Sequence, residues 1–172
     1  DGEYQGATFP FLDGFASGIV RLLFAGDGSL MVGMTSRGWS SLGTKAYGLQ
    51  RVRWTGESVF EIKEMRARSD GFELVFTEPV DVASAGRTDS YTLKSYTYLY
   101  SSAYGSDEIE SDELRVMSAT VAKDARSVRL KVEGLRELFV HELRAKGVRS
   151  VAGAPLVHPD AYYTLNRIPS ER

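Results

Sequence analysis

Apolar and polar residues alternate with a period of two along most of this chain, and no window carries a sustained stripe of period 3.6. The run from Val128 to Val132 is a clear example, because its three apolar residues all fall on one phase. The connections between such runs are rich in Gly, Ser, Asp and Pro, the residues that tight turns favour. The pattern predicts an all-β fold.

The expected strands fall into two groups. Residues 19–24, 30–34 and 49–54 form the first group, and Gly26-Asp27-Gly28-Ser29 between its first two runs is a hairpin signal, because Gly accepts a positive φ. The second group starts near Phe60 and continues at 72–76, 91–100, 114–119, 128–132, 139–145 and 162–165. We expect the second group to pack around a core that includes Phe72, Leu74, Phe76, Leu114, Val116, Val128, Leu130, Val132 and Leu143.

Composition changes near Gly56. Eleven of the 17 Gly and both Trp lie in residues 1–56, whereas residues 57–172 contain 19 of the 23 acidic residues. Dense Gly indicates tight turns between short strands, and the later part reads as longer strands with charged outer faces. We therefore expect a three-stranded segment over 1–56 and a separate domain over 57–172.

Several kinds of site are excluded by composition. The chain has no Cys, which excludes disulfides, thiol chemistry and Cys-ligated metal centres. It has two His, too few for a three-His metal site. The net charge of −2 argues against binding to nucleic acid. No apolar run approaches the roughly 18 residues that a membrane-spanning helix needs.

Two local features are expected to depart from regular strands. In the run from Tyr91 to Tyr100 the apolar phase moves from odd to even positions, which predicts a bulge or kink near Lys94–Ser95. Short helical turns are expected at Ser106–Glu110 and around Leu135.

The best candidates for ligand binding are aromatic. Tyr96, Tyr98, Tyr100 and Tyr104 could form a stacking platform for sugars, because each ring has a flat apolar face and a polar tip. The alternative, that these rings fill one face of a sheet, is favoured by how often packing absorbs aromatics.

Weaker candidates lie in two other loops. Arg37 and Trp39 follow a strand and could contact a ligand, or could stack on each other to fix the loop. The acidic stretch containing Asp107, Glu108, Glu110 and Asp112 suits calcium in its ligand type but lacks an EF-hand spacing, so a solvated loop is favoured.

The two histidines carry no visible site. His141 falls on the apolar phase of its strand, which favours a core position over a catalytic one, and nothing converges around His158. No metal site or catalytic residue is expected in the chain.

The glycine-rich first segment resembles a known family. The stretches Arg37-Gly38-Trp39 and Gly48-Leu49-Gln50-Arg51, with Trp54-Thr55-Gly56, are similar to the last blade of secreted glucose/sorbosone dehydrogenase-like β-propeller proteins. Within 60–169, the stretches Phe76-Thr77 with Pro79-Val80-Asp81, and Gly153-Ala154-Pro155-Leu156, resemble bacterial Ig-like sandwich domains.

This resemblance implies an architecture and a location. It implies a propeller-blade-like segment from the C-terminal end of a larger fold, followed by an Ig-like antiparallel β-sandwich. The chain would be a fragment of a large secreted or periplasmic protein, with the remaining blades as its partners. Any pyrroloquinoline quinone or haem would bind elsewhere in that parent, because the blades that supply the cofactor site and the catalytic base are not in this sequence.

Three functions follow as hypotheses. The first is a non-catalytic accessory domain that docks beside the rest of the parent protein or binds a partner. The second is a contribution of residues, Arg37 first, to the active site of a quinone-dependent sugar dehydrogenase. The third is a carbohydrate-binding module that holds polysaccharide on the tyrosines from Tyr96 to Tyr104.

Overall fold

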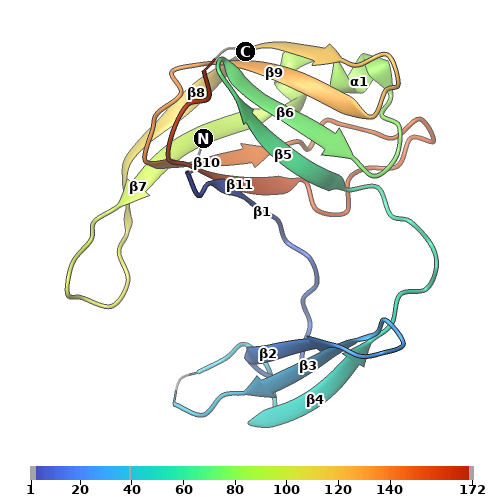
Figure 1. Cartoon of the computed structure of the whole chain (residues 1–172), viewed down its shortest axis with the longest axis vertical. Coiled ribbons are helices and arrows are strands. Elements are labelled where there is room, and N and C mark those ends of the chain that lie inside the picture. Colours follow the sequence, from blue (N-terminus) through green and yellow to red (C-terminus); the bar gives the residue numbers. More distant parts are fainter. Residues whose placement is uncertain (1–2, 39, 171–172) are drawn as a thin grey trace. The chain divides into compact units, whose positions relative to one another are not determined.

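The computed structural model describes residues 3–38 and 40–170, and its strands form two compact units, which are described separately below (Figure 1). The larger unit comprises the chain up to Pro10 and from Val59 onward, and the smaller unit is Phe11–Ser58. The all-β class is confirmed. Helical structure in the described residues is limited to α1 (Val82–Ala85) and the 3-10 turn η1 (Thr88–Ser90).

In the larger unit, all strands belong to one antiparallel sheet, with the order β1-β11-β10-β7-β8-β9-β6-β5. The strands are β1 (Gly6–Thr8), β5 (Ile62–Arg68), β6 (Gly71–Phe76), β7 (Thr92–Tyr98), β8 (Glu108–Val121), β9 (Ser127–Glu133), β10 (Phe139–Arg144) and β11 (Asp160–Leu165).

The long strand β8 makes this sheet fold over on itself. Its first half pairs with β7 as far as Leu114, and its second half pairs with β9 from Arg115 onward. The first and last strands of the order, β1 and β5, come into contact, so the sheet is nearly closed. The result is a sandwich- or barrel-like β fold, and its assignment as Ig-like stays a prediction.

The interior of the larger unit is the expected core. All nine residues predicted for it are buried, and Phe72, Leu74, Val128, Leu130 and Leu143 have no exposed surface. They come from both halves of the folded sheet, so the core depends on β8 bringing those halves together. At about 25 cal/mol for each Å² of apolar surface removed from water, this core is the main stabilising term of the unit.

The pairing is irregular close to the position expected, near Lys94–Ser95, but the extra residue lies on β8 and not on β7. The pairing of β7 with β8 shifts between Ser95 and Thr97, and Glu110 on the partner strand has a positive φ of 53°. β7 keeps its alternation against β10, so the side chains of Ser95 and Tyr96, which are both buried, lie on opposite faces of the sheet.

The helical turn expected at Ser106–Glu110 is wrong from Glu108 onward, because this segment pairs with β7 as part of β8. Near Leu135 the structure has a turn at residues 137–138 and no helix. The helix α1 appears instead where Asp81 caps the chain, its carboxylate accepting a hydrogen bond from Ser84 N at 2.8 Å.

The residues before Pro10 differ from their expected place. We expected them to belong with the glycine-rich segment over 1–56, but β1 pairs with β11, with Ala7 opposite Tyr163. The side chains of Ala7 and Phe9 pack against the core of the larger unit. A pairing between positions so far apart in sequence leaves no local signal.

The smaller unit is the expected three-stranded antiparallel sheet, in the order β2 (Ile19–Phe24), β3 (Leu30–Thr35) and β4 (Tyr47–Val52). Few of its apolar residues are buried. Val32 and Met34 are covered, whereas every residue of β2 is exposed. Large apolar side chains therefore face solvent on both faces of this sheet, because neighbours along β2 point to opposite sides.

Candidate functional site

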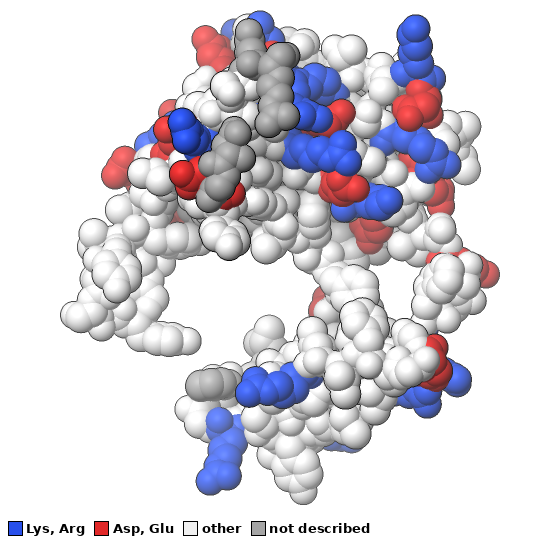
Figure 2. All heavy atoms as spheres, viewed as in Figure 1, with Lys and Arg blue, Asp and Glu red and all other residues white. Residues whose placement is uncertain are grey.

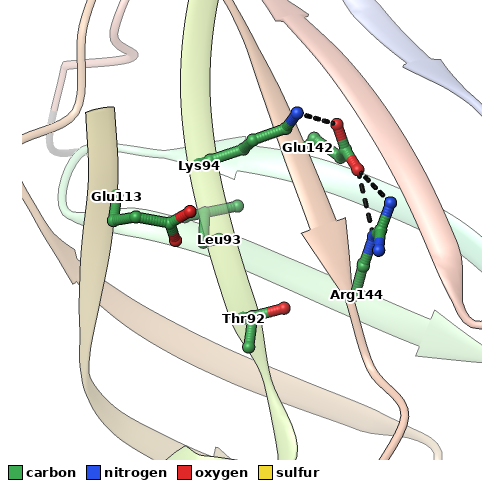
Figure 3. Close-up of a pocket in the computed structure, with 6 residues that line it drawn as sticks. All are labelled: Thr92, Leu93, Lys94, Glu113, Glu142 and Arg144. Atoms are coloured by element: carbon green, nitrogen blue, oxygen red, sulfur yellow. Dashed lines mark hydrogen bonds and ion pairs between the residues drawn. The ribbon is translucent and has the colours of Figure 1, made fainter. Parts of the chain in front are cut away.

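The outer face of β7 carries a row of polar and aromatic side chains, Thr92, Lys94, Tyr96 and Tyr98, at every second position. Strand register places Glu113 of β8 on one side of Lys94 and Glu142 of β10 on the other. These residues line a shallow pocket of about 330 Å³ together with Thr92, Leu93 and Arg144 (Figure 3).

Glu142 is the centre of this pocket. Its carboxylate forms an ion pair with Lys94 Nζ at 3.0 Å and accepts a hydrogen bond from Arg144 Nε at 3.0 Å, and its side chain is only 5% exposed (Figure 3). A buried carboxylate needs such partners, because desolvation otherwise costs several kcal/mol. The arrangement locks the register of β10 against β7.

The cations of the pocket are held in their charged form. The interaction with Glu108, and to a smaller extent that with Glu142, raises the pKa of Lys94. A hydrogen bond to Glu142 raises the pKa of Arg144, and the charge of Asp160 adds to the effect. The site is thus an ion-pair network.

The four candidate tyrosines do not form one platform. Tyr96 is buried on the outer face of β7, and its ring meets that of Tyr98 edge-on, at 5.5 Å and 80°. Tyr100 and Tyr104 lie beyond the strand, on the hairpin that joins β7 to β8 and extends to the left in Figure 1. Tyr98 is half exposed, so three of the four rings are accessible, and polysaccharide binding by them stays a prediction.

The other candidate residues are dispersed. Arg37 is exposed in the turn after β3, where its backbone N–H donates to Thr35 Oγ1 at 3.1 Å, and Trp39 lies outside the described residues. Ligand binding by Arg37 and Trp39 stays a prediction.

The calcium candidates do not converge. Glu108 pairs with Lys94, and Glu110 pairs with Arg136 at 3.3 Å. Across residues 3–38 and 40–170, no group of three or more His, Asp or Glu side chains could hold a metal ion.

The histidines occupy different environments. His141 is fully buried on the inner face of β10, beside the ring of Phe72 at 5.4 Å, which agrees with the expected core position. His158 is partly buried, and its Nδ1 lies 2.6 Å from Glu61 Oε1.

Sequence reasoning missed the network around Glu142. Glu142 falls on the polar phase of its strand and therefore looked like a solvated residue. Its burial depends on Lys94 and Tyr162 being its cross-strand neighbours. Only the order of the strands brings these three residues together, and no spacing along the chain signals it.

Comparison with known proteins finds similarity in structure only. No family model and no curated protein match the sequence. Solved structures of surface layer protein SbsC do match: domains 1-6, with a TM-score of 0.47 and 15% identity, and the N-terminal part of this bacterial S-layer protein, with a TM-score of 0.48 and 15% identity. Each match covers 66% of this chain, which spans 15% and 25% of those chains, respectively.

The expected relation to glucose/sorbosone dehydrogenase-like propellers is wrong, because the structural neighbours are S-layer protein domains and no family model supports it. One of the stretches behind that expectation, Gly48-Leu49-Gln50-Arg51, is part of the ordinary strand β4, which pairs with β3. A strand of this kind identifies local structure and not ancestry. The quinone and haem were expected outside this chain, and its described residues do not test them.

The structure contains no helix in its described residues that is long and apolar enough to cross a membrane.

Proposed function

We propose that this chain is a structural module of a larger secreted multidomain protein, in which the sheet β2–β4 packs against neighbouring parts of that protein. The observation that carries the proposal is the exposure of apolar side chains on both faces of this sheet. Leu22 and Phe24 project on one face and Leu23 on the other, and between 59% and 75% of each is exposed.

Strands that are apolar on both faces are typical of sheets covered on both sides. β2 reads Ile-Val-Arg-Leu-Leu-Phe, with one charged residue in six. A sheet that faced water on one side would alternate apolar with polar residues along this strand. Exposed apolar area of this extent marks a surface that a partner covers.

The larger unit suits the supporting part of such a module. It has its own apolar core and a nearly closed sheet with few free strand edges. An Ig-like sandwich and a secreted or periplasmic location are the finer parts of this proposal.

The test is amide hydrogen exchange of β2–β4, measured in this chain alone and in the larger protein. We expect fast exchange in the chain alone and at least about tenfold slower exchange where neighbouring parts cover the sheet. Equal exchange in the two settings would contradict the proposal.

A matched pair of variants sharpens the test. The double variant Leu22→Lys/Phe24→Lys should abolish the slowing in the larger protein. Val82→Lys changes an equally exposed apolar residue on α1 and should leave the slowing intact. If both variants act alike, the effect does not come from covering the sheet.

A further inference from the structure

We propose that the hairpin joining β7 to β8 is a docking surface for a basic segment of another protein. The Lys and Arg side chains of that segment would lie against the exposed tyrosines of the hairpin and beside its carboxylates. The surface, here called the tyrosine hairpin, comprises residues 98–113. It lies in the larger unit and is independent of the sheet on which the proposed function rests.

The tip of the tyrosine hairpin is aromatic and uncharged. Tyr100 and Tyr104 are fully exposed, and Leu99 and Tyr98 are at least half exposed. No charged residue occurs from Ser95 to Ser106, and the projecting tip is white in Figure 2. The core does not use these rings, so packing within the unit does not explain them.

The composition of the tip is that of a binding loop. Between Tyr98 and Ser106 the residues are Tyr, Leu, Ser, Ala and Gly. Tyrosine supplies a large contact area at a low cost in conformational entropy, and Ser and Gly supply adaptable hydrogen bonding. The backbone is held at its base, where Leu99 N donates to Ser106 Oγ at 3.0 Å.

The charge beside the tip selects a cationic partner. From Ser95 to Glu113 the chain has five carboxylates and no Lys or Arg. Among the described residues, Asp107, Asp112 and Glu113 form no ion pair, whereas Glu108 and Glu110 do. A surface with this imbalance attracts positive charge and repels acidic partners.

Two cations that border this stretch each contact a ring and a carboxylate, and both carboxylates belong to the stretch. Lys94 Nζ lies 4.9 Å from the centre of the Tyr96 ring and 2.9 Å from Glu108. The guanidinium of Arg136 lies 3.6 Å from the centre of the Phe139 ring and pairs with Glu110. The exposed rings of Tyr100 and Tyr104 offer cations of a partner the ring half of this arrangement.

The experiment titrates the full chain with fluorescently labelled decalysine, with decaglutamate as the charge control and with a neutral glucose hexasaccharide. We expect decalysine alone to bind, with affinity falling as the salt concentration rises from 0.05 to 0.5 M. The double variant Tyr100→Ala/Tyr104→Ala should weaken binding roughly tenfold, because each ring supplies a cation–π contact.

Two control variants identify the contact. Tyr100→Phe/Tyr104→Phe should keep most of the affinity, because the ring and not the hydroxyl faces the cation. Tyr4→Ala removes an equally exposed ring elsewhere in the same unit and should have no effect.

Three outcomes would overturn the proposal: no binding of decalysine, equal losses in the Tyr4 and Tyr100/Tyr104 variants, or binding of the hexasaccharide in place of decalysine. The last would assign the tyrosine hairpin to a glycan. None of these outcomes changes the exchange of β2–β4, so they leave the proposed function standing.

Discussion

At the scale of single residues, His141 shows how the core constrains an ionisable group. Its ring has no exposed surface, and Nε2 accepts a weak hydrogen bond of 3.4 Å from Arg136 N. The surroundings contain the ring of Phe72 and the positive charge of Arg136, whose guanidinium donates to Ser95 Oγ at 3.3 Å. Burial, with a further contribution from Arg136, lowers the pKa of His141 to about 4.

This pKa predicts a loss of stability in mild acid. Below the usual histidine pKa of about 6.5 the unfolded chain binds a proton that the folded chain does not bind until about pH 4. Stability that is complete above pH 6.5 therefore falls, by up to about 1.4 kcal/mol per pH unit, as the pH drops from 6.5 to 4. Urea unfolding at several pH values measures the slope.

The variant His141→Gln keeps a hydrogen-bond acceptor for Arg136 N and does not titrate. Its free energy of unfolding should be flatter between pH 6.5 and 4 than that of the unaltered chain. Identical slopes in the two proteins would show that His141 is not the source. The carboxyl groups of Asp27, Asp81 and Asp89 have lowered pKa values, so they act below this window.

At the scale of elements, the start of β6 depends on the absence of one side chain. Gly71 follows the turn at Asp70, and a Cβ at this position would lie 2.0 Å from the carbonyl oxygen of Leu130 on β9. The close approach lets β6 pair with both β5 and β9 from its first residue.

We therefore expect Gly71→Ala to lower the free energy of unfolding by about 3 kcal/mol, because β6 must move away from β9. Gly6→Ala is the matched control, since nothing lies within 4 Å of a Cβ at that position of β1. Thermal unfolding of the two variants compares them directly, and a similar Tm for both would contradict this account.

The strands themselves were largely predictable from alternation. The runs at 72–76 and 128–132 correspond to β6 and β9, because each buries one phase of its side chains. The run at 139–145 corresponds to β10, where Glu142 of the polar phase is buried as well. The length of β8 was not predictable, since its acidic first half, up to Glu113, has no apolar phase and becomes a strand by pairing with β7. The strand order, and with it the Glu142 network, depends on pairings that leave no trace in local sequence.

At the scale of the whole molecule, the two units differ in what holds them together. The larger unit has a continuous buried core, whereas few apolar residues of the smaller unit are buried. Both tryptophans of the chain lie in the range of the smaller unit, and the larger unit has none. Tryptophan fluorescence therefore reports on the smaller unit alone.

We expect two transitions in urea, the first seen by tryptophan fluorescence and the second by circular dichroism of the larger unit. Leu74→Ala leaves a cavity at a fully buried position, so it should lower the free energy of unfolding of the larger unit by about 2–5 kcal/mol. The urea midpoint of the first transition should not change. A shift of both transitions together would show that the units unfold as one.

The pairing of β1 with β11 has a mechanical consequence. These strands are antiparallel, with Gly6 opposite Thr164, and Asn166 Nδ2 donates to the carbonyl oxygen of Tyr4 at 2.5 Å. A tension applied through residues before Gly6 and after Asn166 would load these hydrogen bonds one after another, starting from the same end of the ladder. The chain would yield by unzipping β1 from β11 at low force, while the core around β8 stayed folded.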